Sequence, residues 1–174
     1  IVPPWINKYY ILDMRPDNSF VKWAVDQGHT VFMISWANPD EKLAGKDFSS
    51  YMKEGLFTAL HEVRVATSCD KTNVIGYCIG GTLLATALAY MAQENLSGQI
   101  ASATFLTTLI DFSDPGDLGV FIDEAQLDAL DRKMAEKGYL PASELRNTFS
   151  VLRANDLVWS YVINNYMLGK EPFQ

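Results

Sequence analysis

The feature that most constrains the fold is a cysteine set between glycines where the sequence pattern changes abruptly. Residues 74–82 read VIGYCIGGT. A short apolar run typical of a strand ends at Tyr77, and an Ala- and Leu-rich helical pattern begins at Gly80. Cysteine is commonly a small buried hydrophobe, so simple packing is one interpretation of Cys78. A sharp strand-to-helix turn that presents its side chain is the other, and the neighbouring residues favour it.

The chain on either side of this turn alternates between strand-like and helix-like patterns. Apolar runs typical of strands lie at 1–6, 30–36, 73–77 and 100–109, and helical patterns lie at 17–28, 47–66 and 80–93. Such alternation predicts a parallel sheet with helices on both faces. Three further helical patterns follow with no strand between them, at 121–137, 143–152 and 155–169. We therefore expect an α/β core segment over 1–113 and a helical cap or lid segment over 114–174.

Glycine stands two residues before and two residues after the cysteine, at Gly76 and Gly80. This G-x-C-x-G pattern is similar to the G-x-S-x-G turn of α/β-hydrolases, in which the nucleophile lies between a strand and a helix. The sharp turn crowds both flanking positions, so we expect the two glycines to be structural requirements. The pattern predicts an α/β-hydrolase fold with Cys78 as the nucleophile and the backbone N–H of Ile79 in the oxyanion hole.

The second oxyanion donor of that fold comes from the loop after a neighbouring strand, here the strand that ends near Trp5. Pro3 and Pro4 have no N–H to donate. The backbone N–H of Ile6 or Asn7 is therefore the candidate, with Asn7 chosen. A purely structural turn at this place is the competing interpretation.

A general base is harder to find, because no histidine follows Cys78. His29 lies at the start of a predicted strand and His61 lies within a long helical pattern, and structural or solvent-exposed roles are expected for both. Asp111 follows a strand and could be the acid of a triad, but its DFSDPG context is equally typical of a turn and helix cap. We expect the base to lie outside this chain.

Charge and composition exclude several classes of function. The net charge is −7, which argues against a surface that follows nucleic-acid phosphates. The longest apolar run, residues 83–92, is about half of the ~20 residues that a membrane-spanning helix needs. The two cysteines, Cys69 and Cys78, fit neither a metal site nor a disulfide framework, and a reducing compartment is expected. No metal site and no membrane span are predicted.

Beyond single motifs, the sequence resembles a known family, the polyhydroxyalkanoate synthases, most closely their class I, short-chain type. The resemblance covers nearly the whole chain and rests on five stretches: PPWINKYYILDMRP, QGHTVFMISWANPD, NVIGYCIGGTLLA, TLIDFSDPGDLGVFID and RANDLVWSYVINNYMLGKEPF. It implies an acyltransferase in which Cys78 accepts an (R)-3-hydroxyacyl group, typically 3-hydroxybutyryl, from its coenzyme A thioester. A hydroxyl of another unit then attacks the enzyme thioester, which lengthens a polyester chain and releases coenzyme A.

The same resemblance implies a homodimer on cytoplasmic polymer granules, with a cap domain and without a cofactor, because coenzyme A enters as the substrate thioester. It also implies that the family's catalytic Asp and His lie beyond Gln174 and that the chain is a piece of a longer enzyme, inactive by itself. Two alternatives stay open on the residues alone. One is a cysteine-dependent hydrolase of the same fold, a thioesterase or lactone hydrolase, and the other is a non-catalytic binding module.

Overall fold

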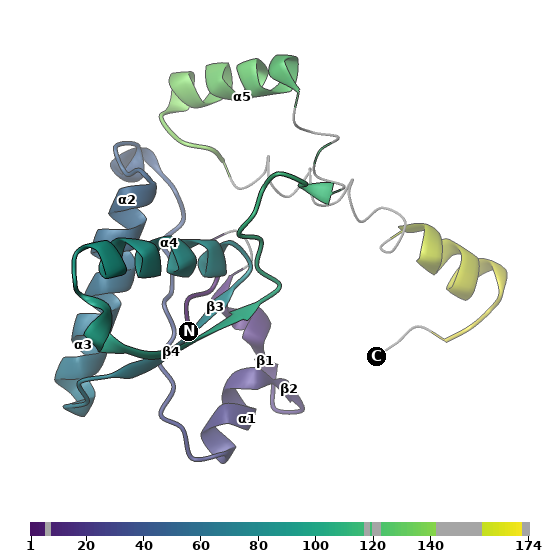
Figure 1. The fold of residues 1–174 in the computed structure, drawn as a ribbon. Helices are drawn as coiled ribbons and strands as arrows, with labels where there is room; N and C mark the ends of the chain where they lie inside the picture. Colours follow the sequence, from purple (N-terminus) through teal and green to yellow (C-terminus); the bar gives the residue numbers. More distant parts are fainter. Residues whose placement is uncertain (6–7, 117–118, 120–122, 142–157, 172–174) are drawn as a thin grey trace. The chain divides into compact units, whose positions relative to one another are not determined.

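The computed structural model describes residues 1–5, 8–116, 119, 123–141 and 158–171, and combines helices with a small parallel sheet (Figure 1). The chain divides into two compact units. The first contains residues 1–38 and 45–112, and the second contains residues 39–44 and 113–174. The α/β class expected from the alternating pattern agrees with the first unit, which holds the parallel sheet and the cysteine.

The sheet is built around two parallel strands, β3 (Thr72–Tyr77) and β4 (Ile100–Leu106). The register places Tyr77 opposite Leu106, so both strands end together. On the other edge of β3, Val2 forms a parallel bridge with Gly76: its N–H donates to the Ile75 carbonyl at 2.7 Å, and its own carbonyl accepts from Tyr77 at 3.0 Å. The N-terminal segment is thus a further parallel neighbour of β3.

Residues 30–36 were expected to form a buried strand, and this prediction is wrong in detail. The backbone of this segment is hydrogen-bonded to Ile1, which donates to the Phe32 carbonyl at 2.7 Å and accepts from the Ile34 N–H at 3.2 Å. No regular strand is assigned over 30–36. The physical reason is its partner: beyond Val2 the neighbouring segment continues as Pro3 and Pro4, which have no N–H with which to extend a ladder.

The strand predicted over 100–109 also differs from expectation. β4 ends at Leu106, and all of its residues are exposed or half-buried, although its apolar sequence predicted burial on both faces. In the described part of the chain, β4 pairs only with β3, so one of its edges has no strand beside it there. Apolar sequence alone did not distinguish this edge position from a central one.

Helices cover one side of β3 and enclose the core. These are α4 (Ile79–Gln93) and a continuous helical stretch made of α2 (Phe48–Ser50), η3 (Tyr51–Phe57) and α3 (Thr58–Thr67). The sequence predicted this stretch as one helix over 47–66. η3 has π-helical hydrogen bonding, which the 3.6-residue pattern did not reveal. The core consists of Val2, Met52, Leu56, Leu60, Val74, Leu83, Leu84 and Ala87.

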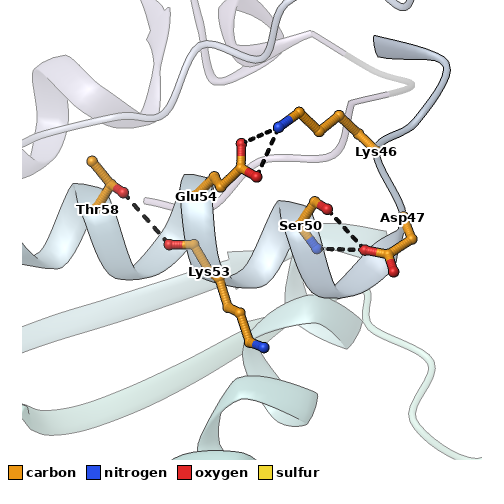
Figure 2. Close-up of polar contacts among 6 residues, drawn as sticks. All are labelled: Lys46, Asp47, Ser50, Lys53, Glu54 and Thr58. Carbon is orange, nitrogen blue, oxygen red and sulfur yellow. Dashed lines mark hydrogen bonds and ion pairs between the residues drawn. The ribbon is translucent and has the colours of Figure 1, made fainter.

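The long helical stretch begins at an N-cap, shown in Figure 2. The Asp47 carboxylate accepts hydrogen bonds from the Ser50 backbone N–H at 2.7 Å and from the Ser50 hydroxyl at 2.9 Å. The backbone hydrogen bond is the main reason that the pKa of Asp47 is lowered from its ordinary value, and the hydroxyl adds to the effect. Glu54, one helical turn after Ser50, pairs with Lys46, whose Nζ lies 2.6 and 2.7 Å from the two carboxylate oxygens (Figure 2).

This cap predicts a pH dependence of stability. Because the folded-state pKa of Asp47 is lowered, its contribution is present above the unfolded-state pKa of about 3.9 and is lost as the pH falls through the folded-state value. Asparagine caps helices comparably but does not titrate there. We expect Asp47→Asn to lower the thermal midpoint at pH 7 and the difference from the unchanged protein to shrink toward pH 3. A difference that stays constant over this range, in thermal unfolding followed by circular dichroism, would contradict the assignment.

Between the first parallel segment and residues 30–36 lies a short connecting region. It comprises η1 (Tyr9–Leu12), the antiparallel pair β1 (Asp13–Arg15) and β2 (Asn18–Ser19), and α1 (Phe20–Asp26). Ser19 is the N-cap of α1, since its hydroxyl accepts from the Lys22 N–H at 2.8 Å. The predicted helix start at 17–19 and the end at Gly28, with φ +87°, therefore agree with the structure, whereas the β1–β2 pair was not predicted. Two single turns, η2 (Glu41–Leu43) and η4 (Ser97–Gln99), complete the assigned elements before residue 100.

The described residues of the second unit form helical segments joined by irregular chain. α5 (Glu124–Lys137) is capped by Asp123, which accepts from the Gln126 N–H at 2.8 Å, and ends at Gly138 with φ +77°. A second helical segment contains η7 (Val162–Met167) and is followed by Gly169 with φ +64°. The helix predicted over 143–152 lies outside the described residues. In the described part of the chain, no helix has the length and apolar character required to cross a membrane.

Candidate active site

Cys78 lies at the junction between β3 and α4, and its backbone conformation is unusual. Its φ of +55° and ψ of −129° fall in a region that residues other than glycine rarely occupy. The Cys78 N–H donates to the Leu106 carbonyl at 2.9 Å, which ties the turn to the end of β4. The side chain is half-buried. Strained backbone of this kind occurs where the surrounding structure holds it in place, and it commonly marks functional sites.

The first turn of α4 provides backbone N–H groups beside this cysteine. The Cys78 carbonyl accepts from Gly81 at 2.9 Å and from Thr82 at 3.3 Å, so the N–H groups of Ile79 and Gly80 precede the first hydrogen bonds of the helix. N–H groups at a helix N-terminus carry partial positive charge. A thiol at this position can attack a carbonyl carbon while the nearby N–H groups donate hydrogen bonds to the negatively charged oxygen that develops.

Gly76 and Gly80 lie where a side chain would collide with backbone. A Cβ on Gly76 would lie 2.5 Å from the Gly81 Cα, and a Cβ on Gly80 would lie 2.7 Å from the Pro3 oxygen and overlap the Val2 oxygen. Real Cβ atoms essentially never come this close to such atoms. The close approach of the helix start to β3 and to the Val2–Pro3 segment therefore depends on both glycines lacking a side chain.

A third glycine and its partner were missed by the sequence analysis. A Cβ on Gly81 would overlap the Thr108 hydroxyl and lie 2.8 Å from its methyl carbon. In the same region the Thr82 hydroxyl donates to the Leu109 carbonyl at 2.7 Å, and Thr107 has a left-handed φ of +46°. These contacts hold the segment after β4 against the first turn of α4. The doubled glycine of the IGGT stretch is the signal that could have revealed this contact.

The segment expected to lead to the second oxyanion donor also contacts the turn. Val2 and Pro3 carry the carbonyls that approach Gly80, and the Trp36 indole Nε1–H donates to the Pro3 oxygen at 2.7 Å. The predicted donors themselves, Ile6 and Asn7, lie outside the described residues. The prediction for Asn7 thus stays a prediction.

The two histidines and the second cysteine lie on other elements of the fold. His29 and His61 are both exposed, His29 after α1 and His61 on α3. Cys69 is an exposed thiol whose N–H donates to the Thr67 hydroxyl at 3.3 Å, in the loop between α3 and β3. Among the described residues, no group of three or more His, Cys, Asp or Glu side chains is arranged as it would be around a metal ion.

Comparison with known proteins agrees with the resemblance found in the sequence. Residues 1–24 match the family described as "Poly-beta-hydroxybutyrate polymerase (PhaC) N-terminus". Three similar curated proteins are the poly(3-hydroxyalkanoate) polymerase of Methylorubrum extorquens (56% identical over 172 residues), the polymerase subunit PhaC of Rhizobium meliloti (51% over 172) and that of Cupriavidus necator (46% over 177). Each match covers 99% of this chain but only 28–30% of the relative. The expected resemblance is therefore confirmed: over 99% of its length, this chain is similar to segments that make up 28–30% of these poly(3-hydroxyalkanoate) polymerases.

Proposed function

We propose that the protein containing this chain is an acyltransferase. It polymerises (R)-3-hydroxyacyl groups, with 3-hydroxybutyryl as the proposed substrate group, from their coenzyme A thioesters into a polyester. The observation that carries the proposal is the placement of Cys78 in a strained turn between β3 and α4. The relatives named poly(3-hydroxyalkanoate) polymerases support the substrate and product class.

We propose the α/β-hydrolase fold for the complete core. Three observations support it: the parallel pairing of β3 with β4, the parallel neighbour formed by Val2, and the nucleophile-type turn at the carboxyl end of β3. Residues 114–174, whose sequence predicts helices, are proposed as the start of a cap or lid. Such a lid would exclude water, which competes with the polymer hydroxyl for the acyl-enzyme.

Two acyl transfers make up the proposed reaction. In the first, the Cys78 thiolate attacks the thioester carbonyl, the C–S bond to coenzyme A breaks, and coenzyme A leaves as a thiolate that takes up a proton. In the second, a hydroxyl of another hydroxyacyl unit attacks the Cys78 thioester, gives up its proton to a general base, and releases the Cys78 thiolate as the ester forms. Thioester-to-thioester exchange keeps the acyl group activated for the second transfer.

The remaining roles follow from the position of the turn. The Ile79 N–H, at the start of α4, and the Asn7 N–H are the proposed oxyanion donors in both transfers. The general base and its acid are proposed to lie outside this chain, since both of its histidines precede Cys78 in the sequence and are exposed. Coenzyme A would act as the carrier of the substrate and not as a resident cofactor.

The resemblance also supports proposals about assembly and location. A homodimer bound to polymer granules in the cytoplasm would place the enzyme at the surface of its own insoluble product. The proposed activity requires a chain longer than this one, because this chain spans about 28% of the length of the polymerases of M. extorquens and R. meliloti.

A product analysis tests the proposal. A protein of the relatives' full length that contains this chain, called the full-length protein below, is incubated with (R)-3-hydroxybutyryl-CoA. We expect release of coenzyme A together with an insoluble polyester, identified by methanolysis and chromatography. Free 3-hydroxybutyrate as the sole product would favour the hydrolase alternative, and no release of coenzyme A at all would favour the binding module.

A further inference from the structure

The Pro3 carbonyl is held between a side chain and the cysteine turn. On one side it accepts a hydrogen bond from the Trp36 indole Nε1–H at 2.7 Å, 33 residues away in the sequence. On the other side its carbon and oxygen lie so close to Gly80 that a Cβ there would be 2.8 and 2.7 Å from them. Gly80 is two residues beyond Cys78, so Trp36 is connected to the nucleophile turn through one peptide group.

The segment of residues 2–4 cannot be held in the sheet by a continuous ladder of backbone hydrogen bonds. Val2 makes ladder hydrogen bonds with Ile75 and Tyr77, but Pro3 and Pro4 have no N–H and cannot continue the ladder as donors. Only their carbonyls remain available as hydrogen-bonding groups. The Trp36 indole, from outside the ladder, is the donor that holds the Pro3 carbonyl.

Trp36 is itself fixed by its surroundings, which gives the hydrogen bond a defined direction. Its ring packs edge-on against Trp5, with centroids 5.9 Å apart and an interplanar angle of 87°, and lies 5.4 Å from the ring of Tyr51. The ring also occupies the space left by Gly55 in η3, where a Cβ would lie 2.6 Å from Cη2 of the indole. The π-helical segment thus presents a glycine to the indole ring.

We propose that Trp36 is a positioning residue for acyl transfer: its indole N–H holds the Pro3 carbonyl against Gly80, and with it the start of α4, where the Ile79 N–H is the proposed oxyanion donor beside Cys78. This inference rests on the proposed function, because it requires that Cys78 be acylated through a tetrahedral oxyanion. Trp36 acts on the stabilisation of that oxyanion and not on the nucleophilicity of the sulfur.

That distinction provides the test, since two reactions of the same thiol differ in it. Acylation by 3-hydroxybutyryl-CoA passes through an oxyanion. Alkylation by iodoacetamide is a displacement at a saturated carbon in which the thiolate expels iodide, so no carbonyl oxyanion forms. In the full-length protein, we expect Trp36→Phe to slow single-turnover coenzyme A release at least about tenfold, with little change in KM, because losing one oxyanion donor outright typically costs 10²–10³-fold. The rate of Cys78 alkylation should stay within about twofold of the unchanged protein.

A matched control and an isosteric variant complete the design. Trp23→Phe makes the same change on α1, where the indole is 57% exposed and stacked on Phe20, and should alter neither reaction. If Trp36→Phe folds poorly, Trp36→3-benzothienylalanine keeps the bicyclic shape and replaces only the N–H by sulfur. Equal losses in acylation and alkylation, or unchanged acylation in the isosteric variant, overturn the proposal. Wild-type protein that releases free acid instead of polymer refutes the proposed function while leaving the Trp36 comparison intact, because acylation of Cys78 is common to both activities.

Discussion

We expect Cys78→Ala in the full-length protein to abolish both coenzyme A release and polymer formation, a loss on the order of 10⁴-fold or more. The reason is chemical, because alanine cannot form the acyl-enzyme from which every later step proceeds. The turn should tolerate the change, since alanine is smaller than cysteine and Cys78 is only half-buried. Coenzyme A release followed by a thiol reagent, together with the circular dichroism spectrum of the variant, measures the effect and shows that folding is retained.

Cys69→Ala is the matched control for this variant. Cys69 is an exposed thiol in the loop before β3, away from the helix start that flanks Cys78. We expect Cys69→Ala to retain full activity and iodoacetamide to label Cys78 faster than Cys69. Comparable inactivation by both substitutions would refute the assignment. Cys78→Ser should be far weaker than the unchanged enzyme, because a hydroxyl is a much poorer nucleophile at neutral pH.

The elements that the sequence predicted well are those with local signals. Asp47 and Ser19 cap helices at the predicted starts, and Gly28 and Gly138 follow helix ends with positive φ. These signals depend on hydrogen bonds and dihedral angles within a few residues, so a single sequence contains them. The turn at Cys78 belongs to the same class, because glycine spacing reports the local crowding.

The contacts that the sequence did not predict depend on partners distant in the chain. No sequence signal distinguished Trp36 from the other tryptophans. Its hydrogen bond to Pro3 depends on the N-terminal segment pairing with β3, a contact between residues distant in the chain. The fit of Thr108 over Gly81 likewise joins two elements that the pattern treated separately. The same cause explains the error for residues 30–36, whose strand character depends on how far a prolyl neighbour can pair.

Gly80→Ala is expected to have the second large effect, through geometry and not through chemistry. The added Cβ would overlap the Val2 oxygen and lie 2.7 Å from the Pro3 oxygen. Neither carbonyl can retreat easily, because Val2 accepts from the Tyr77 N–H in the sheet and Pro3 accepts from the Trp36 indole. The start of α4 must then move, and Cys78 with it. We expect a loss of activity of about 10²-fold, the typical cost of a 1 Å misplacement, together with a destabilisation of about 1–3 kcal/mol from overpacking.

Gly98→Ala provides the control for that prediction. A Cβ at Gly98, in the single turn η4 before β4, would meet no atom within 4 Å, so the same chemical change is made where space is open. We expect this variant to keep both the thermal midpoint and the rate of coenzyme A release of the unchanged protein. A Gly80→Ala protein with full activity would show that the Val2–Pro3 segment yields to the helix start. In that case its carbonyls do not hold Cys78 in place, and Trp36, which acts through the same Pro3 carbonyl, should then also be dispensable.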